Sequence, residues 1–204
     1  MQSAASAIVV DVNETIAVVR FNRPQARNPL SLNTLKELGV AISRFTADDS
    51  ITAIIFTGAE DVFAAGANIQ ELAALDEQRA LKFARLGQEL FQQINETRPM
   101  TIAAINGYCI GGGLDLALAC DIRIASPQAV FAHPGARLGI ITGWGGTQRL
   151  AQLIGRARAF EMLLTARQVS SSEAVRVGLV AKVADDPLAE SLSLAKKRAS
   201  PLRR

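Results

Sequence analysis

The sequence predicts an α/β fold in which a glycine turn joins a buried strand to a short buried helix. The apolar run Thr101 to Ile105 is typical of a buried strand, and Asn106-Gly107 breaks it as a turn does. Three glycines then precede the apolar segment Leu114 to Ala119, which is typical of a buried helix. A second buried strand, Ile51 to Thr57, is also followed by a turn and a helix start, so strands and helices alternate.

The remaining elements follow from periodicity and capping signals. Residues 7–12 and 15–21 alternate as the two strands of a hairpin, and Ser31 caps a helix with apolar Leu32, Leu35, Leu38, Ile42 and Phe45 on one face. Residues 76–98 predict one or two helices, ended by Pro99, with a face formed by Leu81, Phe83, Leu86, Leu90, Phe91 and Ile94. Phe83 and Phe91 are expected in the core, and the alternative is that they are specificity residues. Further elements are expected as strands at 121–125 and 130–132, a helix through Leu153 that GWGG opens, a helix capped by Ser170 and Glu173, and a strand at 179–183.

The glycine turn has the properties of an anion-binding site. Glycines let the main chain approach a ligand closely, and the first N–H groups of a helix have no partner inside it. Two phosphate motifs fail, because the glycines at 107 and 111–113 do not match G-x-G-x-x-G and no Lys-Ser or Lys-Thr follows them. We therefore expect an oxyanion that forms during chemistry on a carbonyl group.

A second backbone donor is expected upstream. Asn68 and Glu71 have the spacing of a helix-capping box with Asn68 as the N-cap. Ala67 then lies just outside the helix start, with its N–H free to face a ligand. Each of the two corners between strand and helix thus offers one amide.

Several segments carry a resemblance to the crotonase superfamily, the enoyl-CoA hydratase/isomerase family. They are collinear with it from about Ile8 to Val183 and comprise FNRPQARNPLS (21–31), VFAAGANIQEL (62–72), INGYCIGGGLDLALACDIRIA (105–125), GWGGTQRLAQLIG (143–155) and LTARQVSSSEAVRVGLVAKV (164–183). The resemblance implies a spiral of ββα units and an enolate-like intermediate. It also implies that the amides of Ala67 and Gly112 hold a thioester carbonyl.

The same resemblance implies the residues that contact the acyl-CoA. The family's first CoA-binding loop matches residues 22–29, which makes Arg23, Ala26 and Arg27 candidates for contact with the adenosine end, although an ordinary solvated loop is an equal interpretation of the arginine side chains. The thioester end is expected to contact residues at both corners, namely Ala65, Ala67, Asn68, Ile69, Gln70 and Gly112. Trp144 is expected in the pocket wall.

The catalytic positions depart from the family pattern. Family hydratases use two glutamates, because adding water to a conjugated double bond needs a base for the water and an acid for the α-carbon. This chain has Asp115 at the first position and Gly135 at the second. Asp115 is the candidate acid/base, and the alternative is a carboxylate that the helix dipole favours without catalysis. His133 is a candidate substitute acid or base, and the alternative is a packed or surface histidine.

Two classes of function follow. The first is a hydratase-like enzyme that acts on acyl-CoA thioesters and stabilises a thioester enolate. The second is an acyl-CoA-binding protein without hydratase activity, in which the pocket is kept and the chemistry lost. A divergent isomerase or hydrolase shares the same oxyanion site and stays open as well.

Composition and charge set the remaining expectations. The chain has 204 residues, 49% of them hydrophobic, and a net charge of +3 without a basic stripe, which disfavours nucleic acid. Without a secretory signal or an apolar run of membrane-spanning length, we expect a soluble cytoplasmic protein without a membrane partner. Cys109 and Cys120 predict buried free thiols, and we expect neither a metal nor a cofactor, since CoA enters with the substrate.

The expected domain organisation is a crotonase-like core over residues 1–183 and a truncated helical segment over 184–204. The family's C-terminal helices close the acyl pocket and build a trimer, but only residues 187–199 follow the last strand here before SPLRR. We therefore expect a shortened C-terminal helical region. A homo-oligomer, the family's trimer or hexamer, stays a possibility that this shortening weakens.

Overall fold

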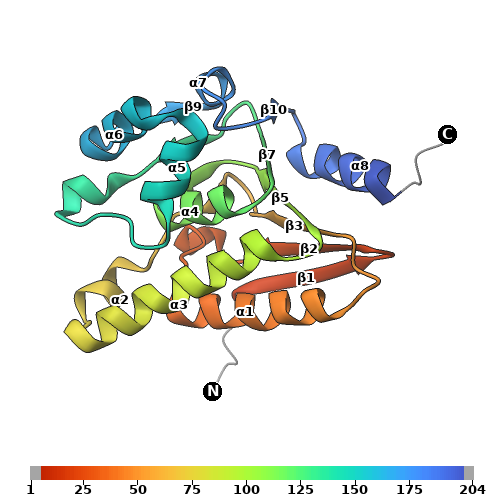
Figure 1. Ribbon diagram of the computed structural model, residues 1–204, viewed down its shortest axis with the longest axis horizontal. Coiled ribbons are helices and arrows are strands. Elements are labelled where there is room, and N and C mark those ends of the chain that lie inside the picture. The colour runs from red at the N-terminus through yellow and green to blue at the C-terminus, as the bar shows by residue number, and fades with distance from the viewer. Residues whose placement is uncertain (1–5, 200–204) are drawn as a thin grey trace.

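The computed structural model describes residues 6–199, and its strands form two sheets (Figure 1). The first sheet has the order β1-β2-β3-β5-β7-β10, with β1 antiparallel to β2 and every other pair parallel. These strands are β1 (Ile8–Asn13), β2 (Ile16–Phe21), β3 (Ala53–Thr57), β5 (Met100–Ile105), β7 (Ile122–Ala125) and β10 (Lys182–Val183). The hairpin and the buried strands that the sequence predicts are confirmed, although β10 is shorter than expected.

The second sheet is smaller and follows the order β4-β6-β8-β9, with only β9 antiparallel to its neighbour. Its strands are β4 (Val62–Ala64), β6 (Tyr108–Ile110), β8 (Val130–Ala132) and β9 (Val169–Ser170). Three times in succession, the chain passes through a strand of the large sheet, a strand of the small sheet and then a helix. This repetition is the spiral of ββα units that the resemblance implies.

Helices connect the strands of the two sheets, and one further helix, α8, follows the last strand. They are η1 (Pro24–Ala26), α1 (Leu32–Ala47), α2 (Ile69–Ala73), α3 (Glu77–Glu96), α4 (Gly112–Ala119), η2 (Pro134–Leu138), α5 (Gly146–Ile154), α6 (Arg156–Thr165), α7 (Ser171–Arg176) and α8 (Pro187–Ala199). Helix α6 follows α5 directly through Gly155, and the sequence analysis did not predict it. The faces of α1 and α3 that the sequence predicts to be buried each contain one exposed leucine, Leu32 and Leu81 respectively.

The large sheet is covered on both faces. Along each strand alternate side chains point to opposite faces, so Val19, Ile54 and Phe56 pack with α1 and α3, while Val18, Ile55 and Ile102 pack with α8. In Figure 1, α1 and α3 lie on one side of this sheet and α8 on the other. Both cysteines are free and buried, as expected.

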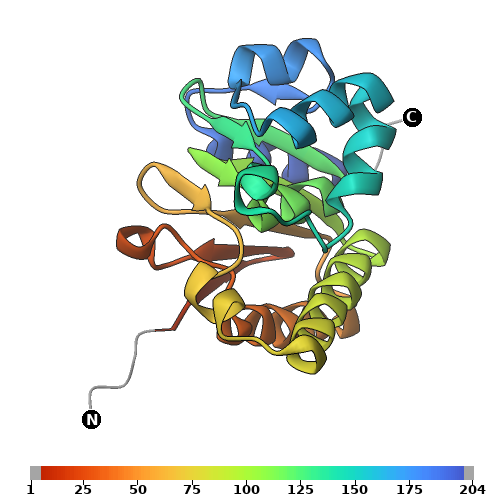
Figure 2. The same ribbon diagram turned by 90° about the vertical axis from the view of Figure 1, so that its left-hand side faces the viewer.

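The side of the molecule that carries α2 and the loop at 133–145 faces the viewer in Figure 2. The start of α2 is set by the local sequence. Asn68 caps this helix by accepting hydrogen bonds from the N–H groups of Gln70 and Glu71, as the predicted capping box requires. In a capping box the glutamate accepts from the N–H of the N-cap residue. Here the Glu71 carboxylate accepts from the N–H of Leu32 at 2.9 Å and so links α2 to the start of α1.

Within residues 6–199, no helix combines the length and the hydropathy that a membrane crossing requires.

Candidate active site

A cavity of about 590 Å³ opens between α2, α3, α4 and the loop at 133–145. Its wall is mainly apolar, and it contains both predicted oxyanion corners. The residues that line it are Ala65, Gly66, Ala67, Ile69, Leu72, Ala73, Leu75, Ala80, Phe83, Ala84, Gly111, Gly112, Asp115, His133, Pro134, Gly135, Leu138, Ile140, Ile141, Thr142, Gly143 and Trp144. The cavity therefore joins the acid/base candidates to the backbone donors in one space.

The two predicted backbone donors lie side by side at this cavity. A methyl group placed on Gly66 would lie 2.8 Å from the nitrogen of Gly112, and one placed on Gly112 would lie 3.5 Å from the nitrogen of Ala67. Gly112 is the first residue of α4, so its N–H has no acceptor within the helix. Ala67 directly precedes the N-cap of α2. The arrangement fits a carbonyl oxygen that accepts from both N–H groups.

Asp115 lies in the first turn of α4 and is 1% exposed. One carboxylate oxygen, Oδ2, accepts a short hydrogen bond from the hydroxyl of Thr142, and the backbone N–H of Trp144 also donates to the carboxyl. Gly146 is required beside it, because a methyl group there would overlap Asp115 Oδ1. The loop that closes the cavity thus fixes the carboxyl in place.

His133 is the nearest titratable partner of that carboxyl. Its Nε2 lies 3.3 Å from Asp115 Oδ1, and both atoms are buried and lack a hydrogen-bond partner among the described residues. Lone pairs on both Nε2 and Oδ1 would repel each other at this distance, so a hydrogen lies on one of these two atoms. The ring is buried and lines the cavity beside the acid/base candidate, and its role as a substitute acid or base stays a prediction.

Burial moves the two pKa values in opposite directions, because it disfavours the charged form of each group. It raises the pKa of Asp115 from 3.8 to about 7, against the opposing hydrogen bonds from Thr142 and Trp144 and the positive charge of Arg149. It lowers the pKa of His133 from 6.5 to about 4. A carboxyl whose pKa is about 7 can both release and accept a proton near neutral pH, as acid/base catalysis requires.

These shifts predict opposite effects of pH on stability when either group is removed. In His133→Gln the folded state binds the Asp115 proton between pH 3.8 and 7 while the unfolded state does not, so stability falls by ~4 kcal/mol as the pH rises through that range. In Asp115→Asn the unfolded state binds the His133 proton between pH 4 and 6.5, so stability rises by ~3 kcal/mol with pH. Urea unfolding at a series of pH values measures both slopes. Parallel slopes in the two variants would contradict the opposed shifts.

Gly135, the position of the missing second carboxylate, is enclosed by its own loop. The N–H of Ile140 donates to the carbonyl of Gly135 at 3.0 Å. A methyl group on Gly135 would lie 2.6 Å from the carbonyl oxygen of Ile140, which is closer than van der Waals contact permits. A side chain at 135 would therefore require the Ile140 carbonyl to shift.

We therefore expect that Gly135→Glu does not create a two-carboxylate site. The new Cβ must displace the Ile140 carbonyl, which breaks a tight turn and lowers the melting temperature, and hydration of crotonyl-CoA stays at or below the wild-type rate. Gly143→Glu is the matched control for stability: a Cβ at Gly143 meets nothing within 4 Å, so this variant is expected to melt near the wild-type temperature. A Gly135→Glu protein that melts at the wild-type temperature and turns over faster would show that the loop tolerates the side chain.

The predicted CoA-contact residues divide into two groups. The cavity is lined by Ala65, Ala67, Ile69 and Gly112. It is not lined by Asn68, which caps α2, or by Gln70, whose N–H donates to the Asn68 side chain. The loop with Arg23, Ala26 and Arg27 lies beyond Ala65, whose N–H donates to the Arg27 carbonyl at 3.1 Å. The Arg27 guanidinium lies 5.6 Å from the centre of the Tyr108 ring. A role of this loop at the adenosine end stays a prediction.

Sequence reasoning missed how Trp144 is held. The indole packs against the Phe83 and Phe91 rings, with centroids 5.3 and 5.5 Å apart, and methyl groups on Gly87 or Gly112 would overlap it. Gly87 breaks the helical pattern of α3, and this was the available signal for a close approach. Phe83 lines the cavity although it belongs to the core as expected, whereas Phe91 is fully buried.

Comparison with known proteins identifies the family of the chain. Residues 11–202 match the family model described as enoyl-CoA hydratase/isomerase. The chain is 40% identical over 196 residues to the short-chain-enoyl-CoA hydratase of Clostridium acetobutylicum, covering 96% of this chain and 74% of the relative. It is 42% identical over 177 residues to the crotonyl-CoA hydratase of Syntrophomonas wolfei, covering 86% of this chain and 68% of the relative.

Solved structures show the same fold. The enoyl-CoA hydratase of Bacillus anthracis superposes with a TM-score of 0.92 at 35% identity, covering 96% of this chain and 77% of that chain. Pseudomonas aeruginosa DspI superposes with a TM-score of 0.91 at 38% identity, covering 97% and 83%. The spiral of ββα units, the paired amides at one cavity and these similarities together establish that the chain belongs to the enoyl-CoA hydratase/isomerase family of the crotonase superfamily.

Proposed function

We propose that the protein is an enoyl-CoA hydratase-like enzyme that acts on an acyl-CoA thioester with Asp115 as its acid/base. The observation that carries this is the position of one buried carboxyl, whose pKa burial raises to about 7, in the same cavity as the Ala67 and Gly112 amides. The relatives named as hydratases support the reaction class.

The proposed reaction adds water across the double bond conjugated to the thioester. The Asp115 carboxylate takes a proton from water while the hydroxyl adds to the β-carbon, and the electron pair of the double bond moves toward the thioester oxygen. The N–H groups of Ala67 and Gly112 stabilise the resulting enolate charge. The protonated carboxyl then returns its proton to the α-carbon, which restores the neutral thioester and the ionised Asp115.

His133 is proposed to hold the shared proton in place. When Asp115 is protonated, the carboxylic acid donates to the neutral imidazole nitrogen 3.3 Å away; when Asp115 is ionised, the neutral imidazole tautomer with its hydrogen on Nε2 donates to the carboxylate. Because burial opposes a charged imidazole, Asp115 alone carries the proton that moves between water and the α-carbon, and His133 stays neutral.

A second candidate function is binding of acyl-CoA without hydration. The steric exclusion of any side chain at Gly135 favours it, because the family reaction uses a second carboxylate there. Loss of the conjugated thioester's ultraviolet absorbance, measured with crotonyl-CoA, separates the two functions. Turnover supports the hydratase; absence of turnover together with an acyl-CoA-dependent rise in melting temperature supports the binding function, and absence of both overturns the acyl-CoA assignment.

The wider setting of this activity also stays at the level of proposal. We propose that CoA enters as part of the substrate and that no further cofactor takes part. A cytoplasmic location and a homo-oligomer remain predictions that the sequence makes.

A further inference from the structure

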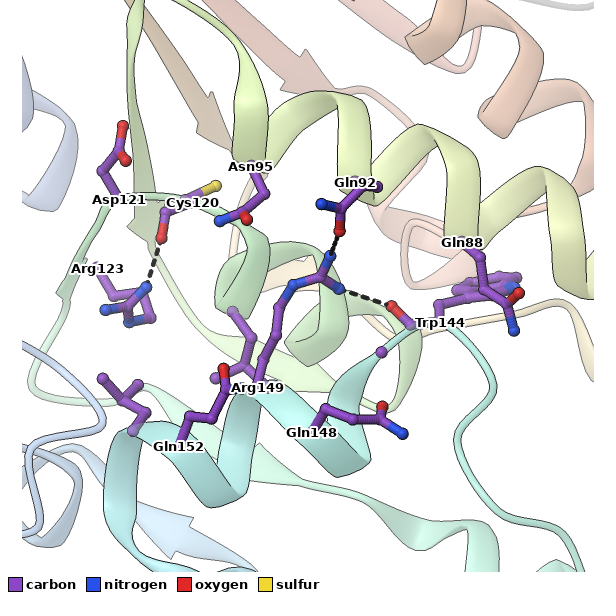
Figure 3. A pocket seen from close by; sticks show the side chains of 13 residues that line it. Gln88, Gln92, Asn95, Cys120, Asp121, Arg123, Trp144, Gln148, Arg149 and Gln152 are labelled. Atoms are coloured by element: carbon purple, nitrogen blue, oxygen red, sulfur yellow. Dashed lines mark hydrogen bonds between the residues drawn. The ribbon is translucent and has the colours of Figure 1, made fainter.

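Figure 3 shows a second, polar pocket of about 570 Å³. Trp144 lines both this pocket and the cavity of the candidate active site, which we call the acyl cavity. The polar pocket is lined by Gln88, Gln92, Asn95, Leu118, Cys120, Asp121, Arg123, Trp144, Gly145, Gln148, Arg149, Gln152 and Leu153. Three of its side chains, Gln88 and Gln92 from α3 and Arg149 from α5, form what we call the clasp.

The clasp residues Gln88 and Arg149 donate hydrogen bonds to the loop at 133–145, which borders the acyl cavity. Gln88 Nε2 donates to the carbonyl of Gly143 at 2.7 Å. Arg149 Nη1 donates to the carbonyl of Trp144 at 3.0 Å, and its Nη2 donates to Gln92 Oε1 at 3.0 Å. In Figure 3 the guanidinium points from α5 toward Gln92 and Trp144. The clasp thus fixes two consecutive carbonyls of the loop to α3 and α5.

The opposite side of the same loop holds Asp115. The Thr142 hydroxyl and the Trp144 N–H donate to the carboxyl, so the peptide groups of this loop face the clasp with their carbonyls and Asp115 with their donors. A methyl group on Gly145 would overlap Arg149 Nη1, and one on Gly146 would overlap Asp115 Oδ1. A turn of two glycines is therefore what separates the guanidinium from the carboxyl.

We propose that Arg149 is a positioning residue for the hydration reaction, because with Gln88 and Gln92 it holds residues 142–145 against Asp115 and its positive charge favours the ionised carboxylate. The inference rests on the proposed role of Asp115 as the acid/base.

The positive charge of Arg149 acts on the Asp115 carboxyl across this turn. The titratable groups that face Asp115 are His133 from the residue before η2, Cys109 from β6 and Arg149 from α5. Burial lowers the pKa of His133 to about 4 and raises the pKa of the Cys109 thiol well above its ordinary value, so both are neutral at pH 7. Of these three neighbours Arg149 alone is charged there, and its charge opposes the rise of the Asp115 pKa.

The test is a direct titration of the Asp115 carboxyl by NMR in protein labelled with ¹³C at the aspartate carboxyl carbon, with Asp115→Asn to identify the signal. In Arg149→Met we expect the Asp115 midpoint about one pH unit higher than in the wild type. Arg149→Lys keeps the charge but cannot bridge two acceptors in a fixed fork, so we expect a smaller rise. Arg44→Met, which removes an exposed arginine from the last turn of α1, is the control and leaves the midpoint unchanged.

The hydration rate provides the second readout. With the higher midpoint, Arg149→Met is expected to be about fivefold slower at pH 7 and to recover as the pH approaches 9, which a general loss of structure would not produce. An Asp115 midpoint equal to the wild type in either folded Arg149 variant overturns the proposal. The NMR titration needs no turnover, so a protein that does not hydrate crotonyl-CoA still decides the role of Arg149 separately from the role of Asp115.

Discussion

Asp115→Asn is expected to lower kcat for crotonyl-CoA hydration by about two to four orders of magnitude, the usual contribution of a positioned acid/base group. The asparagine amide keeps the shape of the carboxyl and accepts from the Thr142 hydroxyl, but it cannot take a proton from water or return one to the α-carbon. KM should change little, because in the proposed mechanism Asp115 acts on the reacting carbons while the backbone amides hold the thioester oxygen. Steady-state kinetics on the two proteins measures this.

The matched control is Asp121→Asn, the same substitution six residues along the chain. The Asp121 carboxylate accepts from the N–H and hydroxyl of Thr101 at 2.7 and 3.0 Å and does not line the acyl cavity. Its replacement should leave kcat per folded protein unchanged. If Asp115→Asn turned over as fast as Asp121→Asn, Asp115 would have no part in the chemistry.

Gly66→Ala is expected to lower kcat by about two to three orders of magnitude, as loss of an oxyanion donor does in other enzymes. Gly66 has a φ of 88°, and a Cβ there would lie 2.8 Å from the nitrogen of Gly112 and 2.9 Å from the carbonyl oxygen of Ile110. Both neighbours are backbone, so the corner that carries Ala67 must move away from the start of α4. The two N–H groups then no longer meet at one oxygen.

Gly155→Ala separates backbone strain from the loss of the oxyanion site. Gly155 has a similar φ of 84°, but a Cβ there meets nothing within 4 Å and the residue lies between α5 and α6, outside the cavity. Both variants should lose stability through the same unfavourable φ, which thermal melting records. Only Gly66→Ala should lose the rate, and equal rates in the two variants would remove the paired amides from the mechanism.

The parts of the site that depend on local sequence could be predicted. The cap at Asn68 and the glycine turn before α4 are fixed by neighbouring residues, so Ala67 and Gly112 followed from spacing and resemblance. The fold class followed in the same way, because buried strands and capped helices alternate along the chain. Helix α6 escaped prediction because it begins directly after the glycine that ends α5, where a loop is the ordinary expectation.

The parts that depend on tertiary contacts could not be predicted. His133 and Asp115 lie 18 positions apart and meet only because β8 pairs with β6, the strand that leads into α4. The short turn between Gly135 and Ile140 and the hydrogen bonds of Arg149 likewise depend on how the loop folds back. Exposure at Leu32 and Leu81 shows the same limit, since a helical pattern identifies a face but not how far its neighbours extend.

The enclosure of Gly135 has a consequence for the evolutionary routes open to this chain. A carboxylate at 135 is useful only after the Ile140 carbonyl has moved, and moving that carbonyl brings no benefit until a carboxylate is there. A single Gly135→Glu substitution is therefore not expected to give two-carboxylate catalysis in this loop. The surroundings of Asp115 offer a more direct route to altered chemistry, because single substitutions there are expected to shift the pKa of its carboxyl.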